Sequence, residues 1–149
     1  MTKKAIYAGT FDPLTLGHVD VLERAAGIFQ HLVVAVASGT SKRTVFSSDE
    51  RVRIVQESVA ALDNVSVEAF DGLLVNYARQ CGCRVLIRGL RAISDFEFEF
   101  QMALMNRKMS PEIETLFLMP NDQYSYLSSS AVREIAQFGG DVHHFVPEP

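Results

Sequence analysis

Five short runs rich in valine, isoleucine, leucine and alanine recur along the chain, and they constrain its fold more than any other feature. They occupy residues 5–8, 32–37, 65–70, 84–87 and 114–119. Strands that are apolar on both faces are typical of parallel sheets covered by helices on each side. The recurrence therefore predicts five buried strands of an α/β protein.

The segments between these runs have the periodicity of helices. In residues 18–29 and 52–62, apolar side chains recur every three or four positions, which places them on one face of a helix. Ser47 and Glu50 precede the second of these segments at the spacing of a capping box. Residues 72–80 and 128–137 provide two more candidate helices. Alternating strands and helices imply right-handed crossovers and a parallel sheet.

The segment SDFEFEFQMALMNRK, residues 94–108, is ambiguous. Phe and Glu alternate at its start as in an amphipathic strand, yet Ser94 and Glu97 have capping-box spacing. We predict a helix, because the segment is long and a crossover is needed between the fourth and fifth strands. Such a helix would be apolar over a wide arc, which suggests burial against a second subunit or a ligand.

The predicted architecture is a single domain over residues 1–149. We expect a Rossmann-like, doubly wound parallel sheet of five strands in the order 3-2-1-4-5, since 149 residues suit one domain. Ligands of such sheets bind beyond the carboxyl ends of the strands, where the strand order reverses. The loops GTFDPLTLGH and RGLRAISD would meet at that point.

Charge, hydropathy and cysteine content exclude several classes of protein. A net charge of −4 argues against non-specific nucleic-acid binding, which needs an excess of basic residues. The longest uninterrupted apolar run, residues 32–37, is too short to span a bilayer, and the N-terminal MTKKAIYAGTFD lacks a signal-peptide core. We therefore expect a cytoplasmic protein with no membrane partner. Cys81 and Cys83 are expected to be reduced, incidental thiols.

The loop after the first strand has the features of a phosphate site. Neither G-x-G-x-x-G nor G-x-x-x-x-G-K-[ST] occurs, which argues against a dehydrogenase and against a P-loop NTPase. Gly9 would let a ligand approach the backbone, Thr10 offers a hydroxyl, and His18 opens a helix whose free N–H groups attract phosphate. A lone histidine there more often caps or packs, but the surrounding pattern favours phosphate binding.

Two further loops are expected at the same edge of the sheet. Arg88 directly follows the apolar residues 85–87, at the mouth of the expected crevice, although a solvated surface position is the ordinary alternative. The serines of NDQYSYLSSS, residues 121–130, precede a helix, where they could act only as an N-cap or also bind an anion. The three loops together predict a site that binds phosphate groups.

The motifs Y-x-G-T-F-D-P, T-x-G-H, L-I-R-G-L-R and Y-L-S-S-S, in this order and spacing, resemble those of bacterial phosphopantetheine adenylyltransferases, in the nucleotidyltransferase superfamily. The resemblance covers almost the whole chain, and R-G-L-R with D-F-E-x-E-x-Q-M/L-A-x-M-N-R is specific to that family. It implies transfer of the adenylyl group of ATP to 4′-phosphopantetheine, which gives dephospho-coenzyme A and pyrophosphate. It also implies a homohexamer.

The resemblance implies roles for individual residues. His18 would stabilise the transition state at the α-phosphate. Phosphopantetheine would be bound by Thr10, Lys42, Leu74 and Arg88. ATP would be bound by Thr10, Phe11, His18, Gly89, Leu90, Arg91, Glu99, Tyr124, Ser125, Tyr126, Leu127, Ser128, Ser129 and Ser130, while Asn106 and Glu134 would line the pantetheine arm.

The sequence contains no dedicated pair of carboxylates for a metal ion. We therefore expect Mg²⁺ to arrive with ATP, and we assign Asp12, beside Pro13, to shaping the turn. Ala8, Leu16 and Phe98 depart from the family pattern without removing a phosphate-binding group. Two alternatives remain, namely transfer to another phosphate such as nicotinamide mononucleotide or glycerol phosphate, and a regulatory module that binds nucleotide without turnover.

Overall fold

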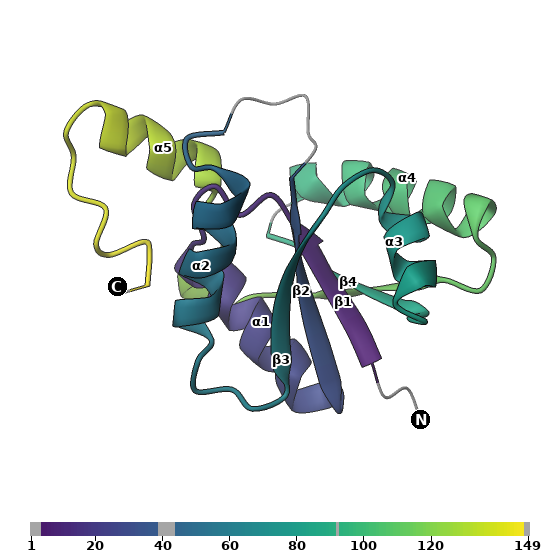
Figure 1. Cartoon of the computed structure of the whole chain (residues 1–149). Coiled ribbons are helices and arrows are strands. Elements are labelled where there is room, and N and C mark those ends of the chain that lie inside the picture. Colours follow the sequence, from purple (N-terminus) through teal and green to yellow (C-terminus); the bar gives the residue numbers. More distant parts are fainter. Residues whose placement is uncertain (1–3, 39–43, 92, 148–149) are drawn as a thin grey trace.

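A parallel five-stranded sheet forms the centre of the chain. The computed structural model describes residues 4–38, 44–91 and 93–147, with their side chains except those of 93–95. The strands are β1 (Lys4–Gly9), β2 (His31–Ala37), β3 (Val65–Phe70), β4 (Val85–Gly89) and β5 (Glu114–Leu118). Their order is β3-β2-β1-β4-β5 (Figure 1). The predicted order is confirmed, and β1 and β4 meet where it reverses.

Helices cover both faces of this sheet. They are α1 (Leu16–Ile28), α2 (Ser48–Ser58), α3 (Leu74–Gln80), α4 (Ile93–Met109) and α5 (Ser129–Gln137), with a short 3₁₀ helix η1 (Asp122–Tyr124) before α5. Figure 1 shows α1 and α2 on one side of the sheet and α3 and α4 on the other. The ambiguous segment is a helix, α4, as predicted. None of the helices among the described residues has the length and apolar character needed to cross a bilayer.

Several boundaries differ from the predictions, and those of three elements near the crevice matter most. The fourth strand begins at Val85 and ends at Gly89, because Arg88 and Gly89 continue the parallel pairing with β5. These two residues are therefore strand residues, not loop residues. Helix α1 begins before His18, at Leu16. Helix α3 begins only at Leu74, because Gly72 has a φ of 82°, which a right-handed helix cannot accommodate.

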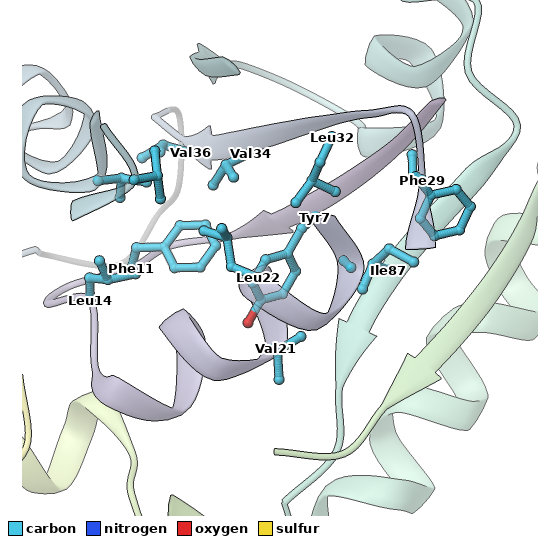
Figure 2. Close-up of a cluster of buried hydrophobic side chains, with 14 of the residues drawn as sticks. Tyr7, Phe11, Leu14, Val21, Leu22, Phe29, Leu32, Val34, Val36 and Ile87 are labelled. Atoms are coloured by element: carbon cyan, nitrogen blue, oxygen red, sulfur yellow. The ribbon is translucent and has the colours of Figure 1, made fainter. Parts of the chain in front are cut away.

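The core lies in two layers, one on each face of the sheet. On the first face, Leu22 of α1 packs with Val34 and Ile87 of the strands, and all three are fully buried (Figure 2). On the other face, Ile6 and its strand neighbours pack against α3. Alternate residues of β1 face opposite layers, as expected for a strand covered on both sides. This packing fixes the carboxyl ends of β1 and β4.

The predicted capping box at the start of α2 is present. The Glu50 main-chain N–H donates to the Ser47 hydroxyl over 3.2 Å, and the Ser47 N–H donates to the Glu50 carboxylate over 3.0 Å. Two N–H groups that the helix leaves free are thereby satisfied. The cap fixes where α2 begins, just after the loop that returns from β2.

Candidate active site

A crevice of about 290 Å³ opens at the carboxyl ends of β1 and β4. It lies where the strand order reverses, which is the usual ligand position in such sheets. The residues with predicted roles that line it come from the three expected loops, the end of β4 and helix α4: Thr10, Phe11, His18, Arg88, Gly89, Arg91, Glu99, Leu127, Ser128, Ser129 and Ser130. The structure thus brings these predicted groups together at one edge of the sheet.

The loop after β1 turns back on itself at Phe11, whose φ is 52°. The Phe11 ring is 3% exposed and lies over Gly9, so that a Cβ at Gly9 would come within 3.0 Å of it. The sequence suggested that Gly9 leaves room for a ligand. Gly9 does line the crevice, and the place that its side chain would take is occupied by the Phe11 ring. This ring also makes edge contacts with Tyr7 at 5.4 Å and His18 at 5.1 Å between ring centres.

His18 is oriented by a reciprocal cap at the start of α1. The Thr15 main-chain N–H donates to Nδ1 of His18 over 3.0 Å, and the His18 N–H donates to the Thr15 hydroxyl over 3.3 Å. Because Nδ1 accepts a hydrogen bond from a main-chain donor, the neutral ring carries its hydrogen on Nε2. His18 therefore caps the helix, as the simpler hypothesis held, and also offers an N–H donor to the crevice.

The imidazole of His18 is neutral over the physiological range. The pKa of His18 is lowered from 6.5 to about 4, chiefly by burial and also by the nearby positive charges of Arg91 and Arg88. The charged form is disfavoured because it would lack water and lie near two cations. The ring is thus set up as a neutral hydrogen-bond donor in a positive environment.

Arg88 forms a bidentate ion pair with Glu99 of α4. Its Nε donates to one carboxylate oxygen over 2.7 Å and its Nη2 to the other over 2.8 Å, while Nη1 donates to the Ala8 carbonyl over 2.7 Å. The guanidinium plane is therefore fixed across the end of β1. Glu99 was expected to contact ATP. The structure pairs it with Arg88, and its contact with ATP remains a prediction.

Arg91 and the serines join the ends of β4 and β5 to the β1 loop. Arg91 donates to the Leu127 carbonyl over 2.6 Å. Ser128 is the N-cap of α5, and Ser129 donates to the Pro13 carbonyl over 2.8 Å. The N-terminus of α5, with its free N–H groups and positive dipole end, therefore lies at the crevice.

Several residues of the crevice were given no role by the sequence analysis. Tyr7 is 4% exposed, and burial raises the pKa of its hydroxyl, which therefore stays protonated. Arg133 donates to the Asp12 carbonyl and to the Ser130 hydroxyl. A sequence signal for Arg133 existed, because a helical residue three positions after Ser130 lies on the same face. Thr15 is the first residue of the T-x-G-H motif, but its bond to the His18 ring became evident only from the structure.

Other residues with predicted roles are placed elsewhere or lie outside the description. Lys42 falls in residues 39–43, outside the described residues. Leu74 packs against the core layer beneath α3. Within the described part of the chain, the lining of the crevice does not include Leu74, Leu90, Tyr124, Ser125, Tyr126, Asn106 or Glu134. Their substrate contacts remain predictions.

The side chain of Asp12 binds main-chain N–H groups of another segment. Its carboxylate is 2% exposed and accepts hydrogen bonds from the N–H groups of Val45, at 2.8 Å, and Phe46, at 3.0 Å. Among the residues that the structure describes, no three histidine, cysteine or acidic side chains come together as a group that could hold a metal ion.

Comparison with known proteins gives consistent relationships. A family model described as cytidylyltransferase-like matches residues 6–135. A phosphopantetheine adenylyltransferase of Alkaliphilus metalliredigens (strain QYMF) is 53% identical over 98% of this chain and 93% of its own. One of Methylococcus capsulatus (strain ATCC 33009 / NCIMB 11132 / Bath) is 56% identical over 99% of this chain and 91% of its own.

A candidate nicotinate-nucleotide adenylyltransferase from Vibrio parahaemolyticus has a similar solved structure. The TM-score is 0.73 and the sequence identity is 16%, over 99% of this chain and 95% of that one. At this identity, the likeness concerns the fold alone.

The sequence relationships extend over nearly the full chain, so the chain belongs to the cytidylyltransferase-like family and, within it, to the phosphopantetheine adenylyltransferases.

Proposed function

We propose that the chain transfers the adenylyl group of ATP to 4′-phosphopantetheine. An oxygen of the acceptor phosphate attacks the α-phosphorus of ATP. The bond between this phosphorus and the oxygen that bridges the α- and β-phosphates breaks, and pyrophosphate leaves with the electron pair of that bond. The product is dephospho-coenzyme A. The observation that carries this proposal is the crevice itself, in which a neutral imidazole lies beside two guanidinium groups and a helix N-terminus.

This reaction needs no covalent nucleophile from the protein. Two anions must be held in line while negative charge spreads over the α-phosphoryl oxygens. Arg88, Arg91 and the start of α5 supply fixed positive potential in the crevice, where preorganised groups act more strongly than in bulk solvent. Nε2 of His18 donates a hydrogen bond to an α-phosphoryl oxygen in this proposal, and it does not transfer a proton.

Mg²⁺ belongs to the proposal as a companion of ATP. It would neutralise charge on the phosphate oxygens and keep several water ligands. The carboxylate of Asp12 already accepts two main-chain hydrogen bonds, which supports a metal held by the nucleotide instead of by protein ligands alone.

A cytoplasmic location is proposed from the sequence, which lacks a long apolar segment.

A homo-oligomer is proposed as well, with six subunits by resemblance. Helix α4 exposes a stripe of large apolar side chains whose exposed fractions range from 38% to 60%: Phe98, Met102, Met105 and Met109. Their spacing places them on one side of the helix. A contiguous apolar surface of this kind is unusual on a monomer and typical of an interface.

His18→Ala separates the proposed chemistry from nucleotide binding. We expect wild-type protein to release pyrophosphate from ATP only when Mg²⁺ and 4′-phosphopantetheine are both present. His18→Ala should lower kcat by about 10²- to 10³-fold, while the Kd for ATP changes by less than about threefold, because the lost contact stabilises charge that develops late. Release of pyrophosphate only with nicotinamide mononucleotide or glycerol phosphate would reassign the acceptor. ATP binding without any turnover would favour a regulatory module.

The neutral state of His18 has a consequence for stability. The unfolded chain takes up this proton near pH 6.5 and the folded chain only near pH 4, so that lowering the pH through this interval favours unfolding. Between about pH 7 and about pH 5, wild type should lose about 1 to 2 kcal/mol more of its free energy of unfolding than His18→Asn does. Urea titrations at both pH values measure this difference. Equal losses in the two proteins would show that the ring is not held neutral.

Arg88→Ala tests the assignment of the acceptor phosphate. Loss of a charged donor should weaken 4′-phosphopantetheine binding by about 10- to 100-fold in calorimetric titrations. Arg84 is exposed, just before the opposite end of β4, and provides the matched control. Arg84→Ala should leave the affinity unchanged. An unaltered acceptor affinity in Arg88→Ala would remove Arg88 from the acceptor site.

The α4 stripe is tested by its effect on mass in solution. Wild type should sediment at about six times the chain mass of 16.6 kDa, and Met109→Glu should shift the distribution to smaller species, because a charge cannot be buried cheaply in an apolar interface. Lys108→Glu changes the exposed residue next to Met109 in the sequence, which lies off the stripe, and should leave the mass unchanged. A wild type that sediments as a monomer would contradict the proposed assembly.

A further inference from the structure

Arg51 is a buried charged residue to which neither the sequence analysis nor the proposed chemistry gives a role. It lies in the first turn of α2, and the residue is 2% exposed. Its Nη1 donates to the carbonyls of Thr10, at 2.8 Å, and Ala37, at 2.7 Å, while its Nε donates to the Phe46 carbonyl over 3.1 Å. Within the described part of the chain, its hydrogen-bond partners are main-chain carbonyls. A buried guanidinium is costly, so this arrangement calls for an explanation.

The three carbonyls belong to segments that surround the crevice. Thr10 follows β1 and lines the crevice, Ala37 ends β2, and Phe46 lies two residues after Thr44, another lining residue. Asp12 reinforces this link, because its buried carboxylate accepts the N–H groups of Val45 and Phe46. Two buried charged side chains thus fasten the turn after β1 to the segment that leads into α2.

The turn that they fasten contains the left-handed residue Phe11. A φ of 52° is unfavourable for an aromatic residue, so it persists only where the neighbouring residues are held. Arg51 holds the carbonyl of Thr10 on one side, and Asp12 is held on the other. The Phe11 ring then packs edge-on against the His18 ring, with an angle of 81° between the planes (Figure 2 shows Phe11 in the core).

We propose that Arg51 is a positioning residue for adenylyl transfer. It touches no substrate, and it acts by fixing the Thr10–Phe11 backbone, which in turn places the Thr10 hydroxyl and supports the imidazole of His18. This inference rests on the proposed function for its kinetic consequences. Its structural consequence, a displaced His18 ring, exists without substrate and can be observed separately.

Kinetics of Arg51→Met provide the first test. Methionine fills a similar volume but has no charge and no donors. We expect kcat to fall by about 10- to 100-fold while the Kd for ATP changes by less than about threefold, because small misplacements of catalytic groups are costly. Arg53→Met removes an exposed arginine from the same helix and should leave both quantities unchanged. A normal kcat in folded Arg51→Met would overturn the proposal.

A double-mutant cycle distinguishes positioning from general destabilisation. If Arg51 acts through His18, Arg51→Met should cause less than about threefold further loss of kcat in the His18→Ala background, because no imidazole remains to be misplaced. A loss of the same size in both backgrounds would contradict action through His18. Thermal unfolding monitored by circular dichroism ensures that every rate is measured on folded protein.

A spectroscopic test is independent of the reaction and of the stability of Arg51→Met. Arg51→Lys keeps the charge but cannot reproduce the planar fork that spans three carbonyls. The imidazole resonances of His18 in ligand-free protein should move in Arg51→Lys and stay in place in Arg53→Lys. Unmoved resonances in Arg51→Lys would refute the positioning role even if the wild type proved to catalyse another transfer. Absence of any turnover by wild type, with the shift present, would instead refute the proposed function alone.

Discussion

The hydrogen bond from the Thr15 main chain to Nδ1 of His18 is the interaction on which the proposed chemistry depends. It is 3.0 Å long and leaves Nε2 as the hydrogen-bearing nitrogen. Burial and two nearby arginines keep the same ring uncharged. A donor that is already oriented and already neutral requires little rearrangement when charge develops on a phosphoryl oxygen. The rest of the crevice can be understood as support for this one group.

That support comes from main-chain contacts as much as from cations. Arg51 and Asp12 bind backbone groups, Arg91 and Arg133 bind carbonyls, and Arg88 is paired with a carboxylate. These bonds fix loops that would otherwise move, which is how a chain with a net charge of −4 keeps a local concentration of positive charge at one sheet edge. Charge placed by the fold, not overall composition, makes the crevice suitable for phosphates.

Much of this arrangement follows from the sequence, for definite physical reasons. Short runs that are apolar on both faces favour parallel strands covered by helices. The strand order then brings the loops after β1 and β4 together. Helix α4 was assigned correctly because its length outweighed the Phe–Glu alternation. The functions of Lys42 and Leu74 are implied by resemblance and remain predictions.

What the sequence could not supply is the direction of individual side chains. The hydrogen bonds of Arg51 join carbonyls that are up to 41 positions away, and no local pattern encodes such contacts. A second reason for a glycine at position 9 could not be seen in the sequence, because the ring that covers it belongs to the left-handed residue Phe11. The tautomer of His18 depends on a donor three positions earlier, and it became evident only from the geometry.

A crystal structure with a non-reactive ATP analogue and 4′-phosphopantetheine tests the central claim most directly. The account predicts an α-phosphoryl oxygen about 2.7 to 3.2 Å from Nε2 of His18, with the acceptor phosphate beside Arg88. An α-phosphate bound elsewhere, with Nε2 facing away from it, would contradict the account.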